Sequence, residues 1–263
     1  MSNLLPIVNN ISYSHLVDYD RCDWLYKLKH IEHLPDFTNS PETIYGTYIH
    51  EAIQDVLSGK IDFPSATKAF LRKWNKFCGI YKKYIKKDIR FGVTCGPSII
   101  SSISEFFKAT FGDHKVLYVE ERLALPASER WPQNFKGFVD MVLELSDGTI
   151  AIVDFKSCSS AYMFNQYKTK QKDYQLVLYK HFYSKKYNID LNKIKTFFVL
   201  LSRDKKNPVS HLEITSGQKK INNALEWMSN ALSAINRQVF FKNRSNCKMY
   251  NKDCTFYKTK HCP

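Results

Sequence analysis

Residues 137–157, GFVDMVLELSDGTIAIVDFKS, contain two mostly apolar runs on either side of a turn at 146–148. Such runs are typical of a β-hairpin in the centre of a sheet, covered on both faces. Away from the turn, three ionisable residues interrupt them: Asp140 in the first run, and Asp154 and Lys156 in the second. A fourth, Glu144, sits next to the turn, where it can reach water. Burying the other three groups is costly unless they are paired or bind a metal ion. The hairpin is therefore predicted to carry a site.

The length of the turn decides which side chains face one another. A three-residue loop with Gly148 in the left-handed conformation sets Asp140 opposite Asp154. Lys156 then projects from the same face as Asp154, because it lies two residues further along the strand. A two-residue turn would shift the register and put the aspartates on opposite faces.

Two facing carboxylates repel each other, and one is expected to take up a proton unless a cation lies between them. Mg²⁺ typically uses one or two carboxylates together with substrate phosphate. The adjacent Lys156 can stabilise charge on a phosphate, or help to position and deprotonate a water molecule. Asp140, Asp154 and Lys156 together therefore predict hydrolysis of a phosphodiester. The alternative is an ordinary Lys–Asp salt bridge at a strand end.

Charge and composition limit the partners of this 263-residue chain. Its formal net charge of +14 favours a polyanion. We find no apolar stretch of the roughly 20 residues that a membrane span needs, and no signal-peptide pattern, so we expect nucleic acid and a cytoplasmic location. Seven cysteines, an odd number, indicate a reducing compartment. The basic runs at 82–87, 167–173 and 202–207 are either solvated surface or, with nearby aromatic residues, part of a nucleic-acid channel.

Hydrophobic periodicity separates helical from strand-forming segments. The predicted helices lie at 12–30, 40–59, 64–112 (two helices), 160–187 and 217–238. The predicted strands begin at about 116 and continue with the hairpin, 195–202 and 209–215. We expect one α/β domain with a mixed central sheet flanked by helices. Its parts are a mainly helical segment (1–115), a catalytic core (116–240) and a cysteine-bearing tail (241–263).

The motifs around the hairpin resemble those of a known family. GFVD at 137–140 and VDFK at 153–156 resemble motifs II and III of the PD-(D/E)XK nucleases. More narrowly, the chain is similar to the RecB-like exonuclease branch, which includes AddB-type and CRISPR-adaptation nucleases. The branch's Gly-x-x-x-His, Gln-x-x-x-Tyr and early S-x-S-x-L…C elements are matched, in the family's order, at Gly46 to His50, Gln175 to Tyr179 and Ser12 to Cys22. D-x-K alone is a weak signal, whereas the ordered set is specific.

The resemblance implies a restriction-endonuclease-like core and a role for each matched residue. His50 would be a metal ligand together with Asp140 and Asp154. A lone histidine at the edge of an apolar helical face is otherwise more often a core residue.

The resemblance also implies that Gln175 and Tyr179, which share a helical face, line the site and contact the nucleic-acid backbone or the lysine. The alternative is an ordinary amphipathic face on which they simply pack. A further acidic residue usually precedes motif II, and Glu120 or Glu121 could fill that place. We prefer Glu120, although neighbouring strand residues point to opposite faces and the sequence does not decide.

Four cysteines raise a separate question. Many RecB-like nucleases hold an iron–sulfur cluster with one N-terminal and three C-terminal cysteines, and Cys22, Cys247, Cys254 and Cys262 match that order. The spacing here is C-x6-C-x7-C, whereas the family usually has C-x2-C-x5-C. We expect a 4Fe–4S cluster on these four residues. The alternatives are zinc bound by the tail cysteines with His261, or reduced thiols at a lost cluster site.

These features together predict a DNA exonuclease that uses Mg²⁺ or Mn²⁺. Its substrate would be single-stranded DNA or DNA ends, in the recombination, repair or replication of a phage or bacterium. The first alternative is a catalytically inactive DNA-binding scaffold, against which the intact Asp140, Asp154 and Lys156 set speaks. The second is an RNase on the same core, since no residue separates RNA from DNA.

Overall fold

The computed structural model describes residues 8–35, 40–81, 89–160, 170–204, 206–249 and 252–263. Backbone contacts divide the chain into two compact units, each made of segments that are distant in the sequence. The cysteine unit comprises 1–39, 122–137 and 216–263, and the carboxylate unit comprises 40–121 and 138–215. The expected single domain, with parts that end at residues 115 and 240, stays a prediction. Within the described ranges, no helix has the length and apolarity that crossing a bilayer requires.

Helices of the carboxylate unit follow the predicted pattern. They are α3 (Pro41–Leu57), α4 (Phe63–Tyr81), α5 (Phe91–Phe111), α6 (Lys170–Tyr187) and the short 3-10 helix η3 (Leu191–Lys193). Ser40 caps α3, because its hydroxyl accepts a hydrogen bond from the Thr43 N–H at 3.3 Å. Pro41 occupies the first turn, where its missing N–H costs nothing. The start of this helix is confirmed where the sequence predicts it.

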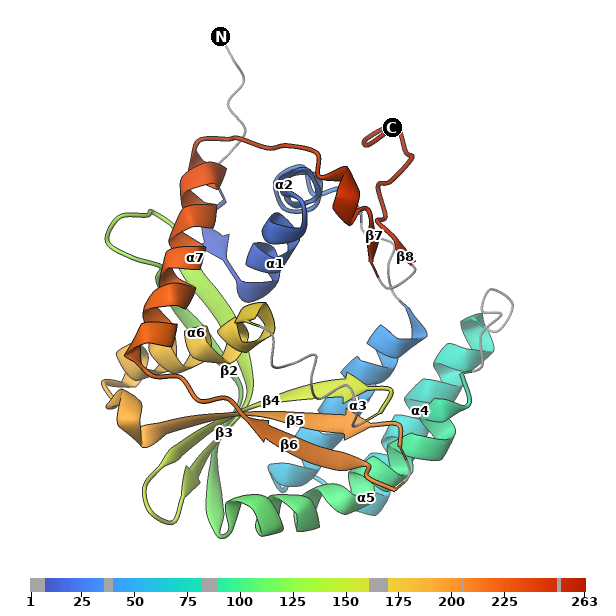
Figure 1. The fold of residues 1–263 in the computed structure, drawn as a ribbon. Coiled ribbons are helices and arrows are strands. Elements are labelled where there is room, and N and C mark those ends of the chain that lie inside the picture. Colours follow the sequence, from blue (N-terminus) through green and yellow to red (C-terminus); the bar gives the residue numbers. More distant parts are fainter. Residues whose placement is uncertain (1–7, 36–39, 82–88, 161–169, 205, 250–251) are drawn as a thin grey trace. The chain divides into compact units, whose positions relative to one another are not determined.

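A mixed sheet forms the centre of the fold (Figure 1). Its strands are β2 (His114–Pro126), β3 (Asn134–Leu145), β4 (Ile150–Cys158), β5 (Ile194–Ser202) and β6 (Val209–Glu213). With the two-residue strand β1 (Asn10–Ile11), the order is β1-β3-β4-β5-β6, and β2 also pairs with β3. Strands β4 and β5 are parallel, whereas β3–β4 and β5–β6 are antiparallel. The predicted α/β fold with a mixed sheet is confirmed.

The central hairpin has the predicted register. Met141 pairs with Val153 and Glu144 pairs with Ile150, and Gly148 has a φ of 77°. The turn is therefore the three-residue loop, with its glycine in the left-handed region that other residues rarely adopt. The next position along this register sets Asp140 opposite Asp154.

Both faces of the hairpin are buried. Met141 and Val153, on one face, belong to a core that also includes residues of α3, α4 and α5. Val142 and Ile152, on the other face, are also fully buried, and α6 contacts β4 and β5. The hairpin is thus central, as its near-continuous apolar runs indicate.

The cysteine unit contains α7 (Gln218–Asn236), which matches the helix that the sequence predicts at 217–238. Its other elements are short: β1 (Asn10–Ile11), α1 (Tyr13–Arg21), α2 (Asp23–Tyr26), the π-helix η1 (Lys27–Ile31), the 3-10 helix η4 (Arg244–Asn246), β7 (Lys248–Met249) and β8 (Lys252–Asp253). The continuous helix predicted over 12–30 is wrong. Cys22 has φ −169° and ψ 115°, so an extended residue separates α1 from α2. The strand β1 pairs in parallel with the first residues of β3, which belong to the same unit.

Candidate active site

Asp140, Asp154 and Lys156 lie together at the end of the hairpin that is away from its turn. Asp154 is only 2% exposed, and its Oδ2 lies 2.7 Å from the Nζ of Lys156. The Oδ2 of Asp140 accepts a hydrogen bond from the Phe155 N–H at 2.7 Å. Residues of β4 therefore hold both carboxylates: the Lys156 side chain pairs with Asp154, and the Phe155 backbone N–H binds Asp140.

The electrostatics of this pair are unfavourable in the absence of a cation. Burial first, and then the Asp154 carboxylate, raise the pKa of Asp140 well above its usual value. Burial also raises the pKa of Asp154, although the charge of Lys156 opposes the shift. One lysine thus balances two buried carboxylates incompletely, and a divalent cation would remove the remaining conflict.

His50 approaches Asp140 from α3. Its Nδ1 lies 3.8 Å from the Asp140 Oδ2, and its ring meets Phe155 edge-on at 5.8 Å. Burial, with the charge of Lys156 as a second cause, lowers the pKa of His50 to about 3. The imidazole is therefore neutral, which is the form that binds a metal ion.

Gly46 explains why α3 can bring His50 so close. A Cβ added at Gly46 would lie 3.0 Å from the Ser157 Oγ on β4. Glycine therefore lets this turn of the helix approach the strand, and His50 follows one turn later on the same face. The Gly-x-x-x-His spacing thus has a packing reason in this chain.

Gln175 and Tyr179 lie on one face of α6 and reach the aspartates. The Gln175 Nε2 donates to the Asp154 Oδ1 at 2.9 Å and to the Tyr179 Oη at 3.1 Å. Gln175 therefore orients the carboxylate that is also paired with Lys156. The structure brings both residues to the site as expected, while their contact with nucleic acid stays a prediction.

Glu120 and Glu121 point to different neighbours. The Glu121 Oε1 accepts hydrogen bonds from the Lys186 Nζ and from the Tyr187 Oη, on the last turn of α6. The Glu120 Oε1 instead accepts a hydrogen bond from the Gln54 Nε2 at 2.7 Å. The same Gln54 amide also donates to the Asp140 carbonyl at 3.3 Å, so the Glu120 carboxylate lies near the aspartates, and its charge raises the pKa of both.

Sequence reasoning missed Gln54. This buried glutamine follows His50 by four residues and Gly46 by eight, so all three lie along one face of α3. This spacing is the sequence signal that could have identified Gln54, because it places a polar residue on the same helical face as the proposed ligand His50.

The residues present fit a hard divalent cation by their chemistry. Carboxylate oxygens and a neutral imidazole suit Mg²⁺ or Mn²⁺. The Nε2 of His50 is buried and has no hydrogen-bond partner in the described part of the chain. No three histidine, cysteine, aspartate or glutamate side chains among the described residues are close enough to enclose one ion as they stand.

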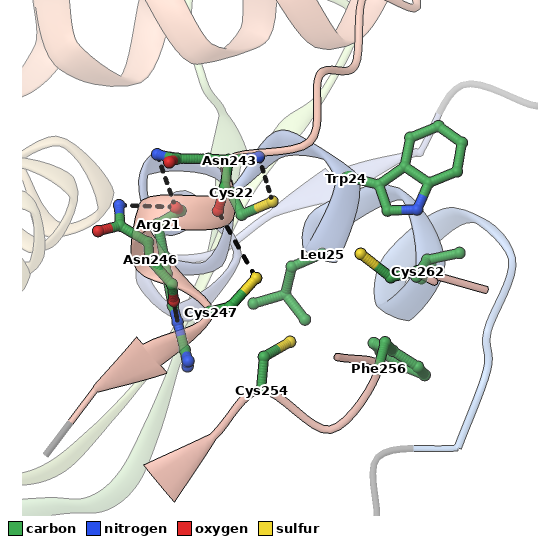
Figure 2. A pocket seen from close by; sticks show the side chains of 11 residues that line it. Arg21, Cys22, Trp24, Leu25, Asn243, Asn246, Cys247, Cys254, Phe256 and Cys262 are labelled. Carbon is green, nitrogen blue, oxygen red and sulfur yellow. Dashed lines mark hydrogen bonds between the residues drawn. The ribbon is translucent and has the colours of Figure 1, made fainter. Parts of the chain in front are cut away.

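The cysteine unit contains a second candidate site. The four predicted cysteines line one partly open cavity together with apolar residues, and their sulfur atoms point toward it (Figure 2). Its lining residues are Arg21, Cys22, Trp24, Leu25, Leu28, Asn243, Asn246, Cys247, Cys254, Phe256 and Cys262. Burial first, and then the other three thiols, raise the pKa of Cys247. Four thiols on one apolar cavity are a donor set that an iron–sulfur cluster uses.

The surroundings of this cavity bear on which metal group the four thiols could hold. The Asn243 N–H donates to the Cys22 Sγ at 3.3 Å, and such hydrogen bonds tune the sulfur ligands of clusters. Zinc would need its sulfur ligands about 3.8 Å apart, as tetrahedral bonds of about 2.3 Å require. Among the described residues, no group of three or more histidine, cysteine, aspartate or glutamate side chains is arranged to hold a metal ion, and His261 is not among the residues that line the cavity. The cluster and the zinc site therefore both stay predictions.

Comparisons with known proteins bear on the family and the fold. The sequence matches the PD-(D/E)XK nuclease superfamily over residues 10–263. It is 28% identical over 159 residues to an ATP-dependent helicase/deoxyribonuclease subunit of Streptococcus uberis, and the match covers 58% of this chain but only 14% of that protein. A crystal structure from Eubacterium rectale, provisionally named an exonuclease, aligns with a TM-score of 0.57 at 15% identity, over 91% of this chain and 86% of that one. At this low identity, the crystal structure supports the fold alone.

Proposed function

Because the chain belongs to the PD-(D/E)XK nuclease superfamily, we propose that it is a DNA exonuclease that depends on Mg²⁺ or Mn²⁺. The observation that carries the proposal is the buried pair Asp140 and Asp154 with Lys156 at 2.7 Å. A structural salt bridge needs one carboxylate, whereas this site keeps two and leaves their charge incompletely balanced. The name of the similar helicase/deoxyribonuclease subunit supports DNA as the substrate.

Asp140, Asp154 and His50 would hold the metal ion, with Glu120 as a further carboxylate. When bound, the ion would stabilise negative charge on the scissile phosphate. Gln175 would keep Asp154 in the orientation needed for binding, since its amide holds the Asp154 Oδ1. His50 would remain neutral over the working pH range, because its pKa lies at about 3.

Lys156 would have two roles. Without substrate it pairs with Asp154 and lowers the charge of the site. With substrate and metal present, its ammonium would point to a phosphate oxygen or to the attacking water, and would stabilise charge or move a proton there. The side chain is partly exposed, at 28%, so it can reach a substrate.

We further propose that Cys22, Cys247, Cys254 and Cys262 bind a 4Fe–4S cluster. The cluster would be structural, joining the break between α1 and α2 to the C-terminal tail within the cysteine unit. The tail has few apolar residues of its own, so bound metal would supply much of its folding energy. No step of the hydrolysis depends on this cluster.

The proposed setting is DNA recombination, repair or replication, with single-stranded DNA or DNA ends as substrate. The net charge of +14 supports a nucleic-acid partner, since lysine and arginine contacts to phosphates supply most of the non-specific affinity. Among the basic runs, 82–87 and 167–169 lie outside the described residues. An inactive scaffold and an RNase remain the alternatives that the experiment must separate.

The experiment offers end-labelled single- and double-stranded DNA and RNA to the protein, with Mg²⁺, with Mn²⁺ and with chelator. We expect metal-dependent release of mononucleotides or short products from DNA ends. Asp140→Asn and Asp154→Asn should each abolish nearly all cleavage while DNA binding persists. The matched control is Asp147→Asn in the exposed hairpin turn, where an asparagine can still accept the Thr149 N–H. Cleavage of RNA alone would make the protein an RNase, and binding without any cleavage would make it a scaffold.

A further inference from the structure

Glu120 has an unusual backbone. Its φ is 53°, in the left-handed region that residues other than glycine rarely adopt, although it lies within β2. This conformation costs about 1 kcal/mol for an ordinary residue, so something must stabilise it. A left-handed residue inside a strand is typical of a β-bulge, which redirects a side chain. Here the side chains of Glu120 and Glu121 reach different partners.

Gln54 is the partner that receives the redirected side chain. It is 7% exposed, and its Nε2 donates both to the Glu120 Oε1 at 2.7 Å and to the Asp140 backbone carbonyl at 3.3 Å. An amide NH₂ has two hydrogens, so one group satisfies both acceptors. Gln54 therefore ties α3 to β2 and to β3 at the point where the aspartate pair begins.

The same helix supplies His50 one turn earlier, 3.8 Å from the Asp140 carboxylate. Glu120 in turn adds a third negative charge, because it raises the pKa of both aspartates. Without a donor at position 54, the Glu120 carboxylate would be repelled by the aspartates and could turn away to solvent, since Glu120 is exposed. The neutral amide can hold the carboxylate in place without cancelling its charge.

We propose that Gln54 is a positioning residue that holds the Glu120 carboxylate toward Asp140 and Asp154, and so sets the affinity of the site for its divalent cation. The inference rests on the proposed function, because it assumes a cation at the aspartate pair. Outer partners of metal ligands typically change metal affinity by about 10–100-fold when they are removed.

The test measures Mn²⁺ binding to the whole chain in the absence of DNA. The methods are titration calorimetry or the electron paramagnetic resonance signal of free Mn²⁺. Gln54→Met keeps the volume but removes the donor, and Gln54→Asn keeps an amide that is too short to reach. Each is expected to raise the Kd for Mn²⁺ about tenfold or more. The control Gln218→Met removes an exposed amide that donates to Asn222 in the other unit, and should leave the Kd unchanged.

A double-mutant cycle separates positioning from a purely structural role. If Gln54 acts through the Glu120 charge, Gln54→Met should change the Kd little once Glu120→Gln is already present. The inference would be overturned if Gln54→Met and Gln54→Asn both left the Kd for Mn²⁺ unchanged. It would also be overturned if Gln54→Met weakened Mn²⁺ binding equally in the parent and in Glu120→Gln. In either case the nuclease proposal would stand. If the parent protein neither binds Mn²⁺ nor cleaves DNA, the proposed function itself fails, and this inference fails with it.

Discussion

Lys156 is the residue whose role is easiest to separate from metal binding. Lys156→Ala should lower kcat by about 10²–10⁴-fold, the usual contribution of a positioned acid or base. Its Nζ now lies 2.7 Å from the Asp154 Oδ2, so removing it frees a carboxylate oxygen. Mn²⁺ should therefore bind as tightly as before, or more tightly, near pH 8. Single-turnover cleavage and Mn²⁺ titration measure the two effects independently.

Lys156→Arg serves as the matched control for the charge. Arginine keeps the positive charge but does not give up a proton at accessible pH. Activity retained in Lys156→Arg assigns a purely electrostatic role, while activity lost in both variants points to proton transfer. Near-normal turnover of Lys156→Ala with a lowered melting temperature would show that the lysine is only a structural ion-pair partner.

Individual site residues differ in how far the sequence could predict them. Asp140, Asp154 and Lys156 were predictable because a strand has a period of two and the turn length determines the register. The orientation of Glu120 was not, since alternation along a strand gives no warning of a left-handed residue. The helical spacing of Gln54 with His50 could have marked it as a candidate, but its hydrogen bond to Glu120 depends on that same local exception.

At the scale of elements, α5 packs against α4 through two glycines. A Cβ added at Gly96 would lie 2.2 Å from the Phe70 Cε1, and one at Gly92 would lie 2.1 Å from the Trp74 Cε2. Both pairs are spaced one helical turn apart, so the rings on α4 fill the gaps that the glycines leave on α5.

Gly96→Ala should therefore destabilise the protein by about 1–3 kcal/mol, as overpacking usually does. Gly79→Ala is the matched control, because a Cβ at this exposed position on α4 would meet nothing within 4 Å. There the gain in helix propensity should stabilise the protein by about 0.5–1 kcal/mol. Urea unfolding of the two variants checks both signs. Equal effects would mean that the α4–α5 contact is looser than the structure indicates.

Helix α1 contains a histidine that should make stability depend on pH. Burial first, and then the neighbouring His30, lower the pKa of His15 to about 4, against the opposing charge of Asp18. The ring centroids of the two histidines are 4.0 Å apart, and Lys29 also pairs with Asp18. The unfolded chain takes up a proton on His15 below pH 6.5, whereas the folded protein does so only near pH 4.

His15 thus contributes stability above pH 6.5, and this contribution is lost as the pH falls toward 4. His15→Phe keeps an aromatic ring of similar size but cannot be protonated. The loss of unfolding free energy between pH 7 and pH 4.5 should be smaller in this variant than in the parent, by about 1–3 kcal/mol. Chemical denaturation at several pH values measures the difference. Parallel curves for the two proteins would contradict the assignment.

Longer elements were predictable where start and stop signals agree with periodicity. The cap at Ser40 and the turn at Gly148 are two such places. The break at Cys22 was not predictable, because the apolar spacing continues through it and only an extended backbone separates the two helices. Two-residue strands such as β1 and β7 are too short to have any period.

At the scale of the whole molecule, contacts group segments that are distant in the sequence. The cysteine unit is built from residues 1–39, 122–137 and 216–263, while the carboxylate unit takes the rest. Hydrophobic periodicity is a local property, and it says nothing about which distant segments come together. The order of family motifs located the carboxylates and the four cysteines, but it did not show that they belong to different units.

The four-cysteine cavity is where the two ends of the chain meet within the cysteine unit. Cys22 and Cys262 line the same cavity although 240 positions separate them in the sequence. A cluster bound there would close a loop of almost the whole chain, and crosslinks across long loops restrict the unfolded state most. By analogy with about 4.7 kcal/mol for a disulfide loop of 100 residues, the stabilisation could amount to several kcal/mol.

Protein purified without oxygen should then be brown and contain about four iron atoms per chain, as a 4Fe–4S cluster requires. Cys22→Ser should lose the iron, the colour and several degrees of melting temperature. Cys78→Ser is the matched control, because Cys78 lies on α4 and does not line the cavity. Cleavage by Cys22→Ser protein that remains folded should persist, since Asp140 and Asp154 belong to the other unit.

Other outcomes of the same purification have distinct meanings. Colourless protein whose zinc survives Cys22→Ser but falls with His261→Ala would establish a zinc site on the tail. Colourless protein without either metal, with Cys22→Ser melting like the parent, would show that the thiols are simply reduced. The unusual C-x6-C-x7-C spacing would then mark a lost cluster site. The raised pKa of Cys247 would fit that state, because neutral thiols tolerate an apolar cavity that thiolates without metal do not.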